Sequence, residues 1–246
     1  MLYQKHAIVK KGVSTAYLEM MSNSNKHDGA QPLHSYENRT EAGQVLAQKL
    51  KDIEFEKRPV VLAIPNGGIP VGVEIAEFLG AELDAIIVRK LQVPGNTEAG
   101  FGALTSQGSL LLNERLVRSI GLNQHQIDLV VKQTQGQIEG RKADYRGLVG
   151  VVDLTEKDVI LVDDGLASGY TMLAAIESVR GLSPNSITVA VPTASSSAAN
   201  LINQAEIHLV CPRIESGFIF AVANAYKKWY DVPDHEVIDV LENFRK

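Results

Sequence analysis

The stretch VILVDDGLASGYT, residues 159–171, decides which fold this chain adopts. Four apolar residues run into two adjacent acids, and a turn of small residues then leads to Tyr170 and Thr171. An uninterrupted apolar run of this kind is typical of a strand that is buried on both faces of a parallel sheet. Two acids at the end of such a strand are costly unless a cation or hydrogen-bond donors meet them. The stretch therefore predicts a ligand site at the carboxyl end of a strand.

Similar units of strand and helix flank this stretch on both sides. Short apolar runs occur at 60–64, 83–88, 186–191 and 207–211, and helical patterns separate them. This alternation predicts an α/β fold with a doubly wound, mostly parallel five-stranded sheet.

Two segments depart from the alternation. Within residues 91–150, the run FGALTSQGSLLLN predicts a hairpin that turns at Gln107–Gly108, and Asn123 is a predicted N-cap of a long helix. We expect this insertion to form a hood or lid beside the main sheet. Residues 20–32 are polar and show no periodicity, and the residues before them form either a short strand or an extension without a structural role. We therefore predict a flexible N-terminal extension over residues 1–35.

Composition narrows the class of protein. The 246 residues suit one α/β domain, and a net charge of −5 argues against a nucleic-acid binder that neutralises phosphates. The single cysteine, Cys211, excludes an internal disulfide and a cysteine-rich zinc site. No segment approaches the ~20 consecutive apolar residues of a membrane-spanning helix. We predict a cytoplasmic protein without a nucleic-acid or membrane partner.

The turn after the two acids has the properties of a phosphate site. Small residues allow main-chain amides to converge, and the start of the following helix adds partial positive charge. Hydroxyl groups in the turn add further donors. The predicted phosphate-binding residues are Gly165, Ala167, Ser168, Gly169, Tyr170 and Thr171.

The acids themselves predict a different contact, because carboxylates repel phosphate. Asp163 and Asp164 can accept hydrogen bonds from sugar hydroxyls or hold a hydrated Mg²⁺. Acids next to a phosphate turn fit a ligand with a phosphate at one end and a diol beside it, such as ribose 5-phosphate. The Walker A and dinucleotide-binding motifs are absent. The alternative is an ordinary turn at a strand end with two solvated acids.

The motif VILVDDGLASGYT resembles the signature of the type I phosphoribosyltransferases, and the resemblance extends over residues 36–230. It implies that residues 36–246 form a phosphoribosyltransferase-like domain with the type I fold. It further implies that Asp163 and Asp164 contact the ribose hydroxyls of 5-phosphoribosyl 1-pyrophosphate (PRPP) and assist the metal. The 5-phosphate would then lie on residues 167–171.

A second loop at a strand end, AIPNGGIPVG at 63–72, is similar to the pyrophosphate loop of that family. Its glycines permit close approach of an anion, and a helix start follows them. Asn66 stands where relatives in this branch carry Arg. Arg89 and Lys90 are predicted to contact pyrophosphate, and the alternative is a basic pair on the surface. The predicted pyrophosphate-binding residues are Pro65, Asn66, Gly67, Gly68, Arg89 and Lys90.

The resemblance implies an Mg²⁺-dependent homodimeric enzyme that transfers phosphoribose from PRPP to a nitrogen acceptor such as a nucleobase. Ala167 stands where enzymes for hypoxanthine and guanine carry a carboxylate, so the turn is closer to the adenine, orotate or xanthine types. Two alternatives stay open: a protein of the same fold that senses PRPP or a nucleotide, and a metal-dependent hydrolase. Two alternatives stay open for Phe218, Trp229 and Tyr230: they stack on the acceptor, or they pack a terminal helix against the sheet.

Overall fold

The structure, a computed structural model, describes residues 35–145, 147–150, 152–217 and 220–244. Apart from Ser35, the predicted N-terminal extension, residues 1–35, lies outside this described part of the chain. Among the described residues, no helix is both long and apolar enough to cross a bilayer.

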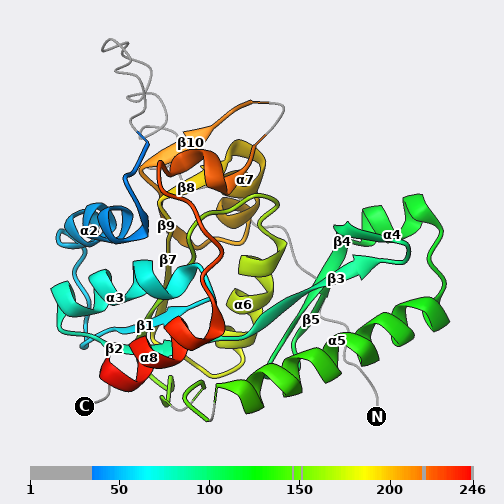
Figure 1. Cartoon of the computed structure of the whole chain (residues 1–246), viewed down its shortest axis with the longest axis horizontal. Helices are drawn as coiled ribbons and strands as arrows, with labels where there is room; N and C mark the ends of the chain where they lie inside the picture. The colour runs from blue at the N-terminus through cyan, green and yellow to red at the C-terminus, as the bar shows by residue number, and fades with distance from the viewer. Residues whose placement is uncertain (1–34, 146, 151, 218–219, 245–246) are drawn as a thin grey trace. The chain divides into compact units, whose positions relative to one another are not determined.

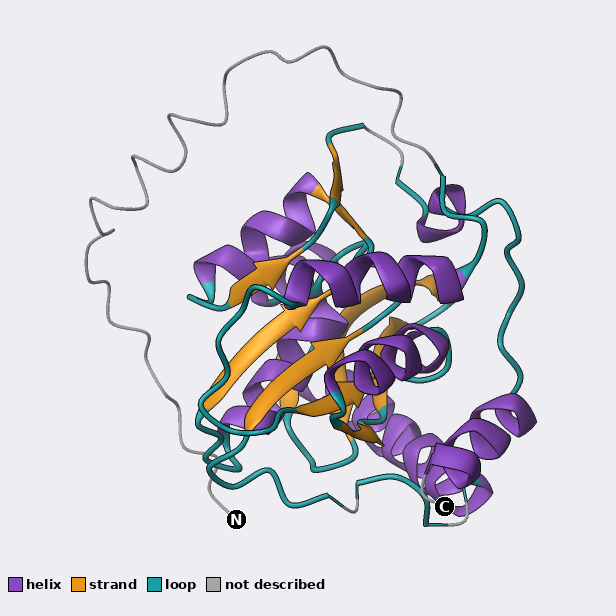
Figure 2. Cartoon of the chain, turned by 90° about the vertical axis from the view of Figure 1, so that its left-hand side faces the viewer, coloured by secondary structure: helices purple, strands orange, loops and turns teal. Residues whose placement is uncertain are grey.

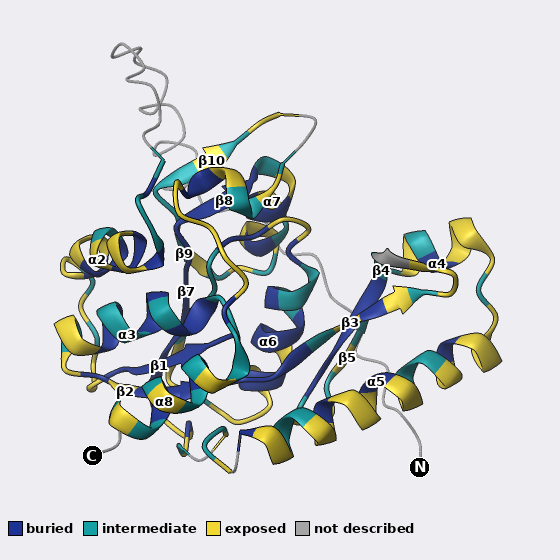
Figure 3. Ribbon diagram, viewed as in Figure 1, coloured by how far each residue is buried: buried dark blue, intermediate teal, exposed yellow. Residues whose placement is uncertain are grey.

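A five-stranded parallel sheet forms the centre, with the strand order β2-β1-β6-β7-β9 (Figure 1). This order confirms the predicted fold class. The apolar runs become strands because both faces of the sheet are covered, so that each residue of β1 and β6 is buried (Figure 3). The strands are β1 (Val60–Ala63), β2 (Glu82–Ala85), β6 (Asp158–Val162), β7 (Ser186–Ala190) and β9 (His208–Val210).

Helices lie on both faces of this sheet (Figure 2). Successive strand residues face opposite sides, so Val61 and Ala63 join one core cluster and Val60 and Leu62 join the other. The first cluster includes residues of α2 (Arg39–Leu50), α3 (Gly68–Leu79) and α8 (Asp234–Phe244). The second includes residues of α6 (Tyr170–Arg180) and α7 (Ser196–Gln204).

A second, antiparallel sheet occupies the residues predicted as a hood or lid. It consists of β3 (Val88–Val93), β4 (Asn96–Thr105) and β5 (Leu110–Leu112), and α4 (Glu114–Ile120) and α5 (Gln124–Asp144) follow it (Figure 1). The predicted hairpin turn is confirmed, since the amide of Gly108 bonds the carbonyl of Thr105 at 3.0 Å. The predicted N-cap is also confirmed, because Asn123 caps α5 in a capping box. Closure of this hood over a ligand stays a prediction.

One strand boundary was predicted wrongly. The run at 83–88 is not one strand, because β2 ends at Ala85 and Val88 already belongs to β3. The two intervening isoleucines, Ile86 and Ile87, are buried in different core clusters. The chain therefore passes from one sheet to the other without any polar or turn residue that would mark the change.

A short pair of parallel strands and two isolated bridges surround the acidic turn. The strands are β8 (Thr193–Ser195) and β10 (Arg213–Glu215), and the 3₁₀ helix η1 (Val222–Ala225) follows them. Leu166 bridges Ala194, while Tyr36 bridges Tyr226. Segments from both ends of the described chain thus meet near the end of β6.

Candidate functional site

The two predicted ligand loops leave the sheet side by side. Strands β1 and β6 are parallel neighbours, and Ala63 pairs with Val162 at their carboxyl ends. A Cβ atom added to Gly67 would lie 1.9 Å from Oδ2 of Asp164, and one added to Gly68 would lie 2.8 Å from the carbonyl oxygen of Val162. The loops are therefore in direct contact, and a side chain at either position would collide with the neighbouring loop.

A glycine precedes each of the two helices that begin at these loops. Gly169 precedes α6 with a φ of 80°, in the left-handed region that favours glycine, and Gly67 precedes α3. Within the described structure, no side chain caps either helix. The first main-chain amides of α6 are consequently available to an anion, as predicted for that loop. Those of α3 are not, because the amides of Gly68 and Ile69 donate to the carbonyls of Ile64 and Asn66 at 3.1 Å, and Pro70 has no amide hydrogen.

Neighbouring strands hold the turn of 165–169 in place. The amide of Leu166 donates to the carbonyl of Thr193 at 2.9 Å, and the hydroxyl of Ser195 donates to the carbonyl of Ala167 at 2.7 Å. Ala167 and Ser168 are exposed, Gly165 and Gly169 are buried, and Tyr170 and Thr171 are half-buried in the first turn of α6. The structure therefore brings all six predicted phosphate-binding residues into one short surface turn.

The two acids differ in their surroundings. Asp164 accepts a hydrogen bond at Oδ2 from Nε of Arg39 at 2.9 Å, and the same oxygen forms an ion pair with Nη2 of Arg39 at 2.8 Å. Asp163 accepts the amide of Asp164 at Oδ1, at 2.8 Å. Burial raises the pKa of both carboxyls; the charge of Asp164 raises the pKa of Asp163 further, whereas Arg39 opposes the rise at Asp164. Asp164 is thus the better compensated anion of the two.

Sequence reasoning missed Arg39. Its position in α2 places it on the buried face that also carries Ala42, Gly43 and Leu46, three, four and seven residues further on. A cation on an otherwise apolar helix face is a signal of a buried ion pair, and this signal was available in the sequence. No pattern in the sequence indicated its partner, Asp164, which lies 125 residues away.

Asn66 lies in a polar network at the start of α3. Its amide nitrogen donates to the carbonyl of Val232 at 2.7 Å and to Asp234 at 2.8 Å. Its amide oxygen accepts from Arg141 at 2.6 Å and from Tyr145 at 2.9 Å. Arg141 also forms an ion pair with Asp234. The preceding residue, Pro65, joins Asn66 through a cis peptide bond.

Arg89 and Lys90 are not equivalent. They are consecutive residues of β3, and consecutive strand residues point to opposite faces. Nε of Arg89 is buried and has no hydrogen-bond partner in the described structure. Burial, followed by the charge of Arg141, lowers the pKa of Arg89, which places the two guanidinium groups near each other. Arg89, and not Lys90, therefore faces the network around Asn66.

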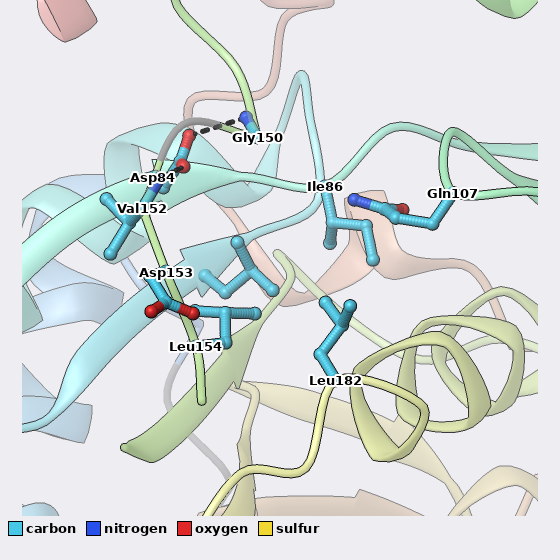
Figure 4. Close-up of a pocket in the computed structure, with 9 residues that line it drawn as sticks. Asp84, Ile86, Gln107, Gly150, Val152, Asp153, Leu154 and Leu182 are labelled. Carbon is cyan, nitrogen blue, oxygen red and sulfur yellow. Dashed lines mark hydrogen bonds between the residues drawn. The ribbon is translucent and has the colours of Figure 1, made fainter. Parts of the chain in front are cut away.

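A separate cavity of about 220 Å³ contains none of the predicted site residues. Leu62, Ile86 and Leu154 contribute apolar walls, and Asp84 lies at its edge (Figure 4). Asp84 accepts main-chain amides of Ala85, Gly150 and Val152 at 2.7 to 2.9 Å. This buried carboxylate thus fastens the loop before β6, which is a structural role.

Comparison with protein-family models identifies the family to which the chain belongs. The model described as phosphoribosyl transferase domain matches residues 33–224. The chain belongs to the phosphoribosyl transferase family. The match spans the acidic turn, the loop at Asn66 and the hood, so the resemblance seen in the sequence is confirmed at the level of the family.

Individual phosphoribosyl transferase relatives agree with this assignment. Two proteins of Mycobacterium tuberculosis, named "Putative phosphoribosyl transferase MT0597" and "Putative phosphoribosyl transferase Rv0571c", are each 33% identical over 207 residues. The matched region covers 84% of this chain and 46% of each relative, so the chain spans about half the length of these curated relatives. The crystal structure of TT1426 from Thermus thermophilus superposes with a TM-score of 0.72 at 32% identity, covering 85% of this chain and 99% of TT1426.

Proposed function

We propose that this chain transfers the 5-phosphoribosyl group of PRPP to a nitrogen acceptor such as a nucleobase, and releases pyrophosphate in an Mg²⁺-dependent reaction. Membership of the family supports the reaction class. The observation that carries the proposal is an acid pair between two helix starts that lack side-chain caps, on adjacent strands. A homodimer and a cytoplasmic location are further parts of the proposal.

The turn after β6 would hold the 5-phosphate. Its amides lie at the start of α6, where the helix dipole favours an anion, and Ser168 is exposed to add a hydroxyl donor. Asp163 and Asp164, immediately before this turn, would face the ribose hydroxyls. The predicted contacts are Gly165, Ala167, Ser168, Gly169, Tyr170 and Thr171.

The loop at 65–68 would face the pyrophosphate, and side chains around Asn66 would supply the donors, because the first amides of α3 already donate to main-chain carbonyls. The positive charge that Asn66 lacks would come from Arg141, which bonds the Asn66 side chain, and from Arg89 nearby. Lys90 was predicted with Arg89, but its place on the opposite face of β3 favours Arg89 alone. The main chain would shape the loop around the pyrophosphate at Pro65, Gly67 and Gly68.

The acid pair fits a divalent cation held partly by the ligand. Burial and mutual repulsion raise the pKa of Asp163, so an added cation would relieve an unfavourable charge. Within the described residues there is no cluster of three or more His, Cys, Asp or Glu that could hold a metal alone, so ligand oxygens and water would complete its shell. When bound, Mg²⁺ would neutralise charge on the pyrophosphate leaving group.

The chain's own residues would act mainly by positioning. The bond from ribose C1 to the pyrophosphate oxygen breaks as a bond from C1 to the acceptor nitrogen forms, and positive charge develops on the sugar. Asp163 and Asp164 would stabilise that charge, while the two loops hold the ends of PRPP apart. The hood would exclude water, which otherwise hydrolyses PRPP.

One observation favours a second candidate, a protein that senses PRPP or a nucleotide without turnover. The donors around Asn66 are already engaged by Asp234, which is a carboxylate of the same chain. A sensor needs to bind the sugar phosphate but does not need to expel pyrophosphate.

The test is to incubate the protein with PRPP, Mg²⁺ and a panel of nucleobases and amines, and to measure pyrophosphate release. Release that requires both an acceptor and Mg²⁺ is expected, and the double variant Asp163→Asn/Asp164→Asn should abolish it. PRPP binding without release for any acceptor would favour the sensor. A protein that neither binds PRPP nor releases pyrophosphate would refute both candidates.

A further inference from the structure

The guanidinium group of Arg39 is almost completely buried, with 5% of the residue exposed. Two of its nitrogens, Nε and Nη1, make hydrogen bonds, and the third, Nη2, forms an ion pair. Nε and Nη2 converge on Oδ2 of Asp164, and Nη1 donates to the carbonyl of Tyr230 at 2.9 Å. Burying a charge is costly, so these bonds must hold the group in one orientation.

Aromatic rings surround the same guanidinium. Its central carbon lies 4.0 Å from the ring centroid of Trp229 and 5.6 Å from those of Tyr226 and Tyr230. These distances fall within the range of cation–π attraction. We call Arg39, Tyr226, Trp229 and Tyr230 the Arg39 cage.

The Arg39 cage holds Asp164 by its side chain and by its main chain. The hydroxyl of Tyr226 donates to the carbonyl of Asp164 at 2.6 Å. On the opposite side, the Cα of Gly67 packs against the carboxylate, where an added Cβ would lie 1.9 Å from Oδ2. Because the hydrogen bond and the ion pair of Arg39 both go to Oδ2, they fix the carboxylate without using Oδ1.

We propose that Arg39 is a positioning residue that fixes the carboxylate of Asp164 in the orientation that meets the ribose hydroxyls. The proposal rests on the proposed function, because it assigns to Asp164 a contact with the sugar. It also gives the segment 226–230 a role, since that segment completes the surroundings of Arg39. A lysine has a single ammonium group and cannot reproduce both contacts with Oδ2 together with the bond to Tyr230.

Trp229 supplies a direct readout, since it is the only tryptophan of the chain. Its fluorescence should report the cation above its ring, and Arg39→Gln and Arg39→Lys should change the emission of the ligand-free protein. Binding of ribose 5-phosphate, and of PRPP with Mg²⁺, is then measured by calorimetry. We expect a loss on the order of 100-fold for Arg39→Gln, because misplacing a contacting group by about 1 Å has effects of that size. Arg39→Lys should lose on the order of ten-fold.

A double-mutant cycle separates positioning from general structural damage. If Arg39 acts through Asp164, then Arg39→Gln should weaken binding little further in an Asp164→Asn background. Arg118→Gln is the matched control, because Arg118 is exposed and pairs only with Glu114 at 3.9 Å in the described structure. It should bind like the wild type.

The outcomes distinguish the two proposals. Wild-type protein that binds neither ligand would refute the proposed function. Wild-type protein that binds both, with Arg39→Lys binding equally well, would overturn the role of Arg39 alone. Fully additive losses in the cycle would also overturn it, because they would mean that Arg39 acts independently of Asp164.

Discussion

The two loops of the site are built in opposite ways. The turn of 165–169 is one continuous stretch, and its donors are main-chain amides at the start of α6. The side that faces Asn66 is assembled from remote segments: β3 contributes Arg89, α5 contributes Arg141, the C-cap of α5 is Tyr145, and α8 contributes Asp234. One half is local and made of main chain, while the other is non-local and made of side chains.

The two halves also differ in whether their hydrogen-bond donors are free to bind an anion. Helices α2, α4, α5 and α7 begin with a capping side chain: Asn38, Asn113, Asn123 and Ser195, respectively. The turn before α6 has no such cap in the described structure, so the amides at the start of α6 are free for a phosphate. On the other side, Asp234 occupies Arg141 and Asn66 and must give way to a pyrophosphate.

The largest effect is expected where the two halves touch. Gly67 has a φ of −61°, so alanine fits its backbone, but the new Cβ would overlap Oδ2 of Asp164. Gly67→Ala should therefore displace that carboxylate and weaken binding of both ribose 5-phosphate and PRPP by roughly 100-fold, measured by calorimetry. The matched control is Gly136→Ala in α5, where an added Cβ meets no atom within 4 Å. The control should leave binding unchanged and stabilise the helix by about 1 kcal/mol. Wild-type affinity in Gly67→Ala would contradict contact between the loops.

The acids between the two halves should respond to amide substitution with opposite signs. Asp164→Asn leaves the buried Arg39 without its counter-charge and should destabilise the protein by about 3 kcal/mol. Asp163→Asn removes a carboxyl whose pKa is raised above its ordinary value of 3.8, and should stabilise the ligand-free protein by about 1 kcal/mol at pH 8.

The sign of the second effect follows from proton linkage. The folded state binds the Asp163 proton more tightly than the unfolded state, so wild-type stability falls as the pH rises from 3.8 through the raised pKa. The gain from Asp163→Asn should thus be present at pH 8 and vanish near pH 4. Urea denaturation of the wild type and of Asp163→Asn at pH 8 and near pH 4 measures this difference in the free energy of unfolding. Destabilisation by Asp163→Asn at pH 8 would show that this carboxylate is compensated in the ligand-free protein.

The local half of the site was predictable from the sequence and the remote half was not. A strand, two acids and a small-residue turn are contiguous, so their spacing already implies their geometry. Asn66 lies 75 residues from Arg141 and 168 residues from Asp234, and no periodicity reports contacts at such separations. The parallel sheet followed from its apolar runs, but the boundary between β2 and β3 is hidden inside one such run. Helix α4, seven residues long, was not predicted.

The smallest effect concerns the carboxylate that occupies the remote half. Asp234 is the first residue of α8 and its side chain is 44% exposed, so Asp234→Asn should keep the helix start while removing the charge that competes with pyrophosphate. We expect PRPP affinity to rise about three-fold, whereas Arg141→Gln should lower it about ten-fold. Affinity for ribose 5-phosphate, which has no pyrophosphate, should change in neither variant. Asp239→Asn, an exposed acid of the same helix, controls for net charge. A loss of PRPP affinity in Asp234→Asn would mean that the carboxylate supports the anion site, and the contrast between a free half and an occupied half would then be wrong.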